Sequence, residues 1–272
     1  TCEENKIYYA VAAGTLDQEQ FEKYKTDEYF LGQVGPSIDT EYEAGVEMGK
    51  FFADKGIKTA AIYGAFIPNP MHVYRTAGVL AGLGLSYGGA TTEEDVVGLI
   101  FADQGIDLSK ISGDIKIVSY LQGYGDTTTD EINAAIQAAP EAFISVGMAT
   151  TFFTQQLNAA GIEFSDIDSF TKSNGEAITN GKLVYLAGKY SSSVGPAFAL
   201  VMNAINGNVI RDAQGNAVSL SQNYQVATDS ETFDKFYKND NGDNPIYSRD
   251  TLDQIIGDTV TFDTINEVVA SN

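Results

Sequence analysis

The sequence predicts an α/β protein built on a doubly wound, Rossmann-like parallel sheet. Short apolar strands alternate with segments of helical periodicity, and this alternation indicates right-handed βαβ units. The strands are apolar almost throughout, as expected where helices cover both faces of a sheet. The 272 residues are 43% hydrophobic and include 27 Gly without a repeating period, which excludes a disordered chain and a collagen.

The beginning of the chain contains one clear strand, a polar stretch and a second apolar segment. We expect the strand over Lys6–Ala12, which is β-branched and aromatic. The apolar segment Phe30–Val34 is closed by Gly35-Pro36. A helix with apolar positions about one turn apart follows, and Lys55-Gly56 ends it with a cation and a C-cap glycine.

Strand-then-helix units fill the middle of the chain, and a polar insertion at Tyr87–Gly113 interrupts them. The predicted strands are Ile57–Ala65, Ile115–Leu121, Ala142–Val146, Asp168–Thr171 and Leu183–Ala187. The predicted helices are Met71–Leu83, Thr129–Ala139, Thr150–Ala160 and Val194–Ile205. The tail has shorter pieces, namely a strand at Tyr224–Ala227, a polar turn at Lys238–Pro245 and a brief helix at Arg249–Ile256.

Acidic side chains outnumber basic ones by 37 to 16, which gives a formal net charge of −21. A field of this sign repels phosphate groups, so we expect no nucleic-acid partner and no docking on an anionic membrane. The apolar runs fall far short of the roughly 20 residues that a membrane helix needs, so we expect no direct membrane insertion. The charge fits plain solubility or an extracellular setting.

The residues that often carry chemistry form no catalytic pattern. The only cysteine, Cys2, makes neither a disulfide nor a zinc cluster, and we expect it to be buried or at a helix end. The sequence has a single histidine, His72, and no G-x-S-x-G motif, so a Ser-His-Asp catalytic triad is not expected. The glycines of Gly82–Gly89 follow a helix, and Asn239–Asp243 lacks an acid that a calcium loop needs, so both are expected to be turns. We therefore expect no enzyme activity, no metal and no cofactor.

The carboxyl ends of the predicted strands are the best candidate for a site, because ligands of open parallel sheets bind outside these ends. Aromatic and polar residues follow the strands, and Arg75 lies one turn into the next helix. We expect a small-molecule site formed by Asn69, Arg75, Gln122, Tyr124, Met148, Thr171, Lys189 and Tyr190, with Phe66, Pro68, Gly147 and Lys172 at the same strand ends.

Three segments, Val34–Gly64, His72–Leu83 and Leu183–Asn208, resemble the type I periplasmic (solute-binding) protein family in order and spacing. This family also includes the effector domains of LacI-like regulators. The first segment resembles the crossing into the second lobe, and the second resembles the ligand-side Arg with its mid-helix Gly, here Arg75 and Gly78. The third resembles the hinge strand and the helix that ends in Asn-Gly.

The resemblance implies two α/β lobes that are joined by three crossings and clamp a ligand between them. The second lobe would comprise 36–188 and 225–272, and the remnant of the first lobe 1–35 and 189–224. Only one strand is expected before the first crossing, so the chain resembles a fragment or processed form that lacks much of the first lobe. The hinge residues would be Gly35, Pro36, Gly188 and Tyr224.

The function that the resemblance implies is the extracytoplasmic solute-binding component of an ABC-type importer, lipid-anchored in the full-length protein, with a membrane permease as partner. Its ligand would be small and polar, a sugar or a carboxylate-bearing molecule. Met148, Thr171 and Lys189 stand where sugar binders of the family often have Asn, Asp or Gln, and Arg75 with Lys189 favours an anionic group. The alternative is a ligand-sensing domain of a LacI-like regulator or an extracellular receptor.

Overall fold

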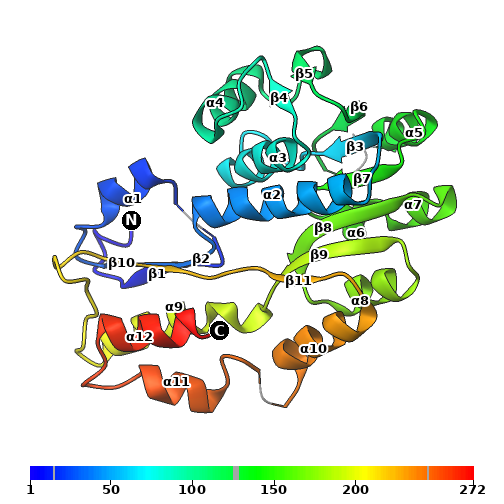
Figure 1. Ribbon diagram of the computed structural model, residues 1–272. Helices are drawn as coiled ribbons and strands as arrows, with labels where there is room; N and C mark the ends of the chain where they lie inside the picture. The colour runs from blue at the N-terminus through cyan, green and yellow to red at the C-terminus, as the bar shows by residue number, and fades with distance from the viewer. Residues whose placement is uncertain (15, 125–128, 244) are drawn as a thin grey trace. The chain divides into compact units, whose positions relative to one another are not determined.

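The computed structural model describes residues 1–14, 16–124, 129–243 and 245–272, which fold into two compact units (Figure 1). Unit 1 comprises Thr1–Thr40, Lys189–Tyr224 and Tyr237–Asn272. Unit 2 comprises Glu41–Gly188 and Gln225–Phe236. Within the described ranges, no helix is both long enough and apolar enough to cross a membrane.

Unit 2 is built on a six-stranded sheet with the strand order β11-β9-β8-β7-β3-β6. Its strands are β3 (Thr59–Tyr63), β6 (Lys116–Leu121), β7 (Ala142–Ser145), β8 (Glu163–Ser169), β9 (Leu183–Lys189) and β11 (Gln225–Ala227). Strand β3 pairs in parallel with both β6 and β7, and β7 pairs in parallel with β8. The short β11 pairs antiparallel with β9 at the edge of the sheet. The predicted α/β fold with a parallel-dominated sheet is confirmed.

Helices connect these strands. They are α2 (Ile38–Asp54), α3 (Pro70–Gly82), α4 (Glu93–Asp103), α5 (Thr129–Gln137), α6 (Ala149–Phe152), α7 (Thr154–Ala160), α8 (Lys172–Thr179) and α10 (Ser230–Asn241). The helices at α2, α3 and α5 were predicted, α6 and α7 divide the predicted helix Thr150–Ala160, and α4, α8 and α10 lie outside the predicted helices. Helix α2 ends as the sequence indicates, with Gly56 in the left-handed region at φ 78°. The polar insertion holds α4, a short turn η1 (Leu108–Lys110) and the strand pair β4 (Ser86–Tyr87) and β5 (Ile111–Ser112).

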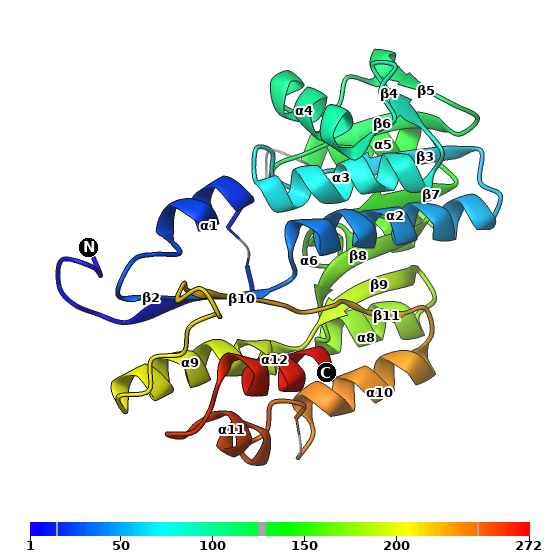
Figure 2. The ribbon, with the colours of Figure 1, turned by 60° about the vertical axis from the view of Figure 1, so that its left-hand side comes forward.

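Helices α2 and α3 lie side by side in both ribbon views (Figures 1 and 2). Glycines make this close approach possible, because a Cβ atom on Gly78 would lie 2.1 Å from the carbonyl oxygen of Tyr42. Likewise, a Cβ atom on Gly45 would lie 2.1 Å from the carbonyl oxygen of Arg75. The two backbones are therefore in direct contact where Glu41 and Arg75 face each other.

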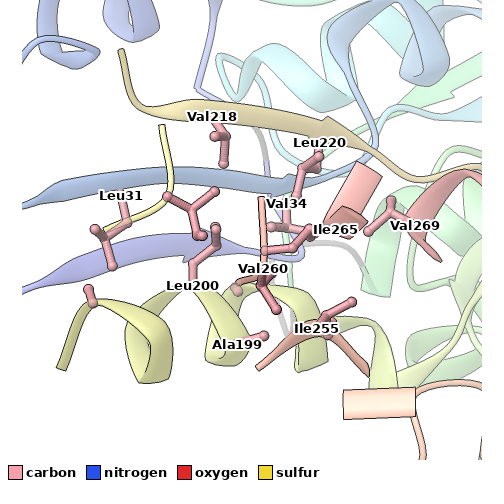
Figure 3. Close-up of a cluster of buried hydrophobic side chains, with 13 residues drawn as sticks. Leu31, Val34, Ala199, Leu200, Val218, Leu220, Ile255, Val260, Ile265 and Val269 are labelled. Carbon is pink, nitrogen blue, oxygen red and sulfur yellow. The ribbon is translucent and has the colours of Figure 1, made fainter. Parts of the chain in front are cut away.

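Unit 1 has a three-stranded parallel sheet in which β2 (Phe30–Gly35) lies between β1 (Tyr9–Ala12) and β10 (Val218–Ser221). Its helices are α1 (Gln18–Tyr24), α9 (Gly195–Ile205), α11 (Arg249–Ile255) and α12 (Phe262–Ala270), with the turn η3 (Ser191–Val194) before α9. Figure 3 shows the core, in which strand side chains such as Val34 and Leu220 meet Leu200 of α9 and Ile265 of α12. Burying these side chains is what holds the sheet and helices of unit 1 together.

The C-terminal segment differs from its predicted place. The expected second lobe included residues up to 272, whereas Tyr237–Asn272 packs in unit 1. Ile255, Val260 and Val269 of this segment are buried in the same core as Leu31 and Val218. The unit also contains two strands before residue 40, β1 and β2, where one strand was expected.

Three local predictions were wrong. The fourth strand of the second lobe is Glu163–Ser169 instead of Asp168–Thr171, because its buried Asp166 is satisfied by hydrogen bonds that the sequence does not display. The expected polar turn at Lys238–Pro245 begins as the last turn of α10, which runs to Asn241, and position 244 lies outside the described residues. Cys2 is exposed and not buried.

Candidate functional site

The carboxyl ends of β6, β3, β7 and β8 are neighbours in the sheet of unit 2, so the loops that follow them share one edge. Phe66 follows β3 and Tyr124 follows β6, and their rings are stacked with centroids 5.9 Å apart and an interplanar angle of 17°. Both rings are accessible, with exposed fractions of 46% and 39%. Phe152 of α6 lies next to them, its ring centroid 5.8 Å from that of Tyr124. We call these three residues the aromatic edge.

Phe66 is held from helix α3. The Nδ1 atom of His72 lies 3.1 Å from the backbone nitrogen of Phe66 and 3.0 Å from its carbonyl oxygen. Asn69 caps the same helix, because its Oδ1 accepts a hydrogen bond of 3.0 Å from the backbone nitrogen of Met71. The buried His72 is therefore a positioning residue for Phe66, a role that its place at a helix start did not reveal.

Arg75 is buried, with an exposed fraction of 3%, and forms an ion pair inside unit 2. Its Nε atom donates a hydrogen bond of 2.6 Å to Oε2 of Glu41 on α2, and its Nη1 atom donates one of 2.9 Å to the carbonyl oxygen of Val146. In the first contact the carboxylate of Glu41 compensates the positive charge of the guanidinium group, and the second contact holds the backbone at the end of β7. Arg75 therefore stabilises the strand end, and its charge is already paired with a carboxylate.

Met148 follows β7 with a left-handed backbone, φ 68°, and its side chain is 37% exposed. The turn that carries it is anchored by Asp166 of β8, whose Oδ2 accepts a hydrogen bond of 2.8 Å from the backbone nitrogen of Thr150. Oδ1 of Asp166 accepts further hydrogen bonds from the backbone nitrogen of Ile167, at 3.0 Å, and from Oγ of Ser145, at 3.2 Å. Burial in the protein interior raises the pKa of Asp166 from 3.8 to about 7.

Two other predicted residues of unit 2 make local structural contacts. Gln122 accepts a hydrogen bond of 2.8 Å from the hydroxyl of Tyr120, and its Nε2 atom donates one of 3.1 Å to the carbonyl oxygen of Gln104. Thr171 is the N-cap of α8 and accepts from the backbone nitrogen of Asn174. These side chains therefore shape the strand ends, while Phe66, Tyr124 and Met148 present accessible surface.

The predicted site residues Lys189 and Tyr190 lie in unit 1. The Nζ atom of Lys189 donates a hydrogen bond of 3.2 Å to the carbonyl oxygen of Ala13 and lies 5.9 Å from the ring centroid of Tyr224. Tyr190 is buried, and this burial raises the pKa of its hydroxyl. Gly188 and Tyr224 are the last residues before two of the points at which the chain passes between the units, and Gly35-Pro36 lies shortly before another. Their role as hinges stays a prediction.

Nothing in the part of the chain that the structure describes resembles a metal site, since no group of three His, Cys, Asp or Glu side chains is placed to hold an ion. The buried Asp166 is surrounded by hydrogen-bond donors of its own unit. The edge thus offers ring faces, a thioether and backbone groups, which suit the binding of a small molecule.

No family model matches the sequence, and no curated protein matches it. Several solved structures do. An ABC transporter periplasmic solute-binding protein from Actinobacillus succinogenes 130z with bound D-allose matches with a TM-score of 0.59 and 16% identity, over 86% of this chain and 74% of the other. The arabinose-binding periplasmic component from Shewanella sp. ANA-3 matches with a TM-score of 0.56 and 16% identity, over 88% and 70%.

The fructose-binding periplasmic domain of a hybrid two-component system matches with a TM-score of 0.57 and 12% identity, over 86% of this chain and 67% of the other. These structural neighbours are type I periplasmic sugar-binding proteins, and they are binding proteins rather than enzymes. At such identities the likeness shows a shared fold, so the predicted resemblance to this fold is confirmed.

Proposed function

We propose that this chain binds a small neutral sugar outside the cytoplasm, as the solute-binding component of an ABC-type importer. The observation that carries the proposal is the stacked, accessible pair of Phe66 and Tyr124 at the carboxyl edge of a sheet whose fold is that of sugar-binding proteins. The carboxyl edge is where ligands of open α/β sheets bind. The partner would be a membrane permease, and no covalent chemistry is expected.

The chemistry of the edge favours a sugar ring. A pyranose or furanose presents C–H groups on its faces and hydroxyl groups at its rim, so it packs well on an aromatic face while its rim bonds polar groups. Exposed rings at the end of a sheet are otherwise costly, because their apolar surface faces water. A sugar that covers the ring of Phe66 or Tyr124 removes part of this surface from water.

A neutral ligand fits unit 2 better than the carboxylate-bearing ligand that the sequence also allowed. That alternative depended on Arg75 and Lys189. The guanidinium of Arg75 is paired with Glu41 at 2.6 Å, so a ligand carboxylate would have to displace a buried carboxylate in order to use it. The ammonium of Lys189 bonds the backbone of Ala13. We therefore propose a neutral ligand, with Gly35, Pro36, Gly188 and Tyr224 as hinges of a closing movement that the ligand stabilises.

One alternative has an observation in its favour. The fructose-binding neighbour belongs to a hybrid two-component system, so the same fold also serves as a sensor domain. In that case this chain would bind a sugar at the same edge and pass the signal to a receptor. The LacI-like regulator that the sequence resemblance also allowed is less compatible with the net charge of −21, because DNA repels such a protein.

Isothermal titration calorimetry with a panel of sugars tests the proposal. The panel should contain D-allose, L-arabinose, D-fructose and myo-inositol, with D-galacturonate as the anionic probe. We expect at least one neutral compound to bind with a dissociation constant in the micromolar range or below, and the uronate to bind more weakly. Tight binding of the uronate alone, or no binding of any sugar in the panel, would contradict the proposal.

A further inference from the structure

A pocket of about 470 Å³ opens between helices α6, α7 and α8 of unit 2. Its walls include Thr151 and Phe152 of α6, Gln155 and Gln156 of α7, and Glu176 of α8, with Asn180 at the end of α8. We call it the side pocket. Its volume lies in the range of roughly 300–1,000 Å³ that is typical of small-molecule sites. None of the site residues predicted from the sequence lines this pocket.

The side pocket and the aromatic edge have one residue in common, Phe152. Phe152 lines the pocket, and its ring lies 5.8 Å from the ring of Tyr124, which in turn stacks on Phe66. The three rings therefore form a row that leads from the ends of β3 and β6 to the pocket between α6 and α8. A ligand that extends beyond a single ring could follow this row without leaving unit 2.

The chemistry of the pocket walls is unusual for a site of this size, because hydroxyl and amide groups dominate it. Thr, Gln, Ser and Asn side chains make up most of the lining. Such groups both donate and accept hydrogen bonds, as the hydroxyl groups of a carbohydrate do. Among the described residues, Glu176 is the one charged side chain in the lining, and its Oε1 atom lies 4.0 Å from Nζ of Lys172. The lining formed by these residues contains no basic side chain that would attract an anionic ligand.

We propose that the side pocket binds a second sugar unit, so that the ligand of this protein is a neutral oligosaccharide of at least two units. One unit would lie on Phe66 and Tyr124, and the next would pass Phe152 and bond the amides of Gln155 and Asn180. This inference rests on the proposed function and extends it, because it assigns the ligand class by length. It predicts that affinity rises with the number of sugar units.

The test compares matched pairs of sugars by isothermal titration calorimetry. The pairs are D-glucose with maltose and with cellobiose, D-galactose with β-1,4-galactobiose, and D-xylose with xylobiose. We expect one pair or more in which the disaccharide binds at least tenfold more tightly than its monosaccharide. Equal or weaker binding of every disaccharide, while a monosaccharide binds, would overturn this inference and leave the proposed function standing. No binding of any sugar would overturn the proposed function itself.

A pair of variants then locates the second unit. In the variant Gln155→Ala/Asn180→Ala, we expect the disaccharide to lose most of its tenfold advantage while the monosaccharide keeps its dissociation constant. The matched control is Gln137→Ala, an exposed glutamine on α5 that does not line the pocket. A disaccharide advantage that persists in the double variant, with circular dichroism showing a folded protein, would contradict the placement in the side pocket.

Discussion

Replacing Gly78 with alanine tests the packing that supports the site. Gly78 lies inside helix α3, where glycine costs about 1 kcal/mol relative to alanine. Helix propensity alone therefore predicts that Gly78→Ala stabilises the protein. The structure predicts the opposite, because the new Cβ atom would lie 2.1 Å from the carbonyl oxygen of Tyr42 and 2.9 Å from the backbone nitrogen of Val46.

The size of the effect follows from these distances. Ordinary van der Waals contact begins at 3.4 Å, so α2 and α3 would have to separate locally by about 1 Å. Overpacking of this kind costs roughly 1–3 kcal/mol. After the gain of about 1 kcal/mol in helix propensity, we expect a net loss in the free energy of unfolding of up to about 2 kcal/mol. The ion pair between Glu41 and Arg75 joins the same two helices, so its 2.6 Å contact would be stretched as well.

Urea unfolding followed by far-UV circular dichroism measures this change, which suits a chain without tryptophan. The matched control is Gly98→Ala, since Gly98 lies within α4 and an added Cβ there meets nothing within 4 Å. We expect the control to stabilise the protein by about 0.5–1 kcal/mol. If Gly78→Ala also stabilises it, the close contact between α2 and α3 is refuted.

Two further predictions concern buried charges. Glu41→Ala removes the carboxylate that pairs with the buried Arg75, so we expect the free energy of unfolding, measured with urea, to fall by about 3–5 kcal/mol. The double variant Glu41→Ala/Arg75→Ala should lose less stability than the sum of the two single variants. Strict additivity of the two losses would argue against the pair. The raised pKa of Asp166, about 7 in the fold against an ordinary 3.8, means that the folded state holds this proton more tightly than the unfolded state. The contribution of Asp166 to the free energy of unfolding is therefore fully present below pH 4 and is lost as the pH rises through 7, by at most about 4 kcal/mol. Asp166→Asn should remove this part of the pH dependence of the free energy of unfolding. A pH dependence that is unchanged in Asp166→Asn would contradict this prediction.

The sheet was predictable where its strands are continuously apolar. Strands β3 and β7 lie inside the predicted ranges Ile57–Ala65 and Ala142–Val146, because nothing polar interrupts the buried runs. The β8 strand was misplaced because Ser165, Asp166 and Asp168 break its apolar pattern. Asp166 is tolerated there only through hydrogen bonds to Ser145 and Thr150, which no local pattern displays.

Some contacts among the predicted site residues could be predicted from the sequence, and others could not. Phe66 and Tyr124 were both inferred from the ends of neighbouring strands, and their rings do meet. Arg75 was expected to face a ligand, and the structure shows it paired with Glu41, which lies 34 residues earlier on another helix. Helical spacing identifies side-chain partners on the same helix and not on two different helices, so this ion pair could not be predicted from the sequence.

Binding of a neutral sugar to the Phe66→Ala variant tests the central claim most directly. The sugar from the calorimetric panel that binds wild-type protein is titrated into Phe66→Ala and into Phe198→Ala, a control that truncates a 50% exposed phenylalanine on α9 of unit 1. We predict that Phe66→Ala weakens binding by about threefold to tenfold, the range that loss of an aromatic stacking contact implies, while Phe198→Ala binds as the wild type does. Wild-type affinity in Phe66→Ala would contradict the assignment of the sugar site to this edge of unit 2.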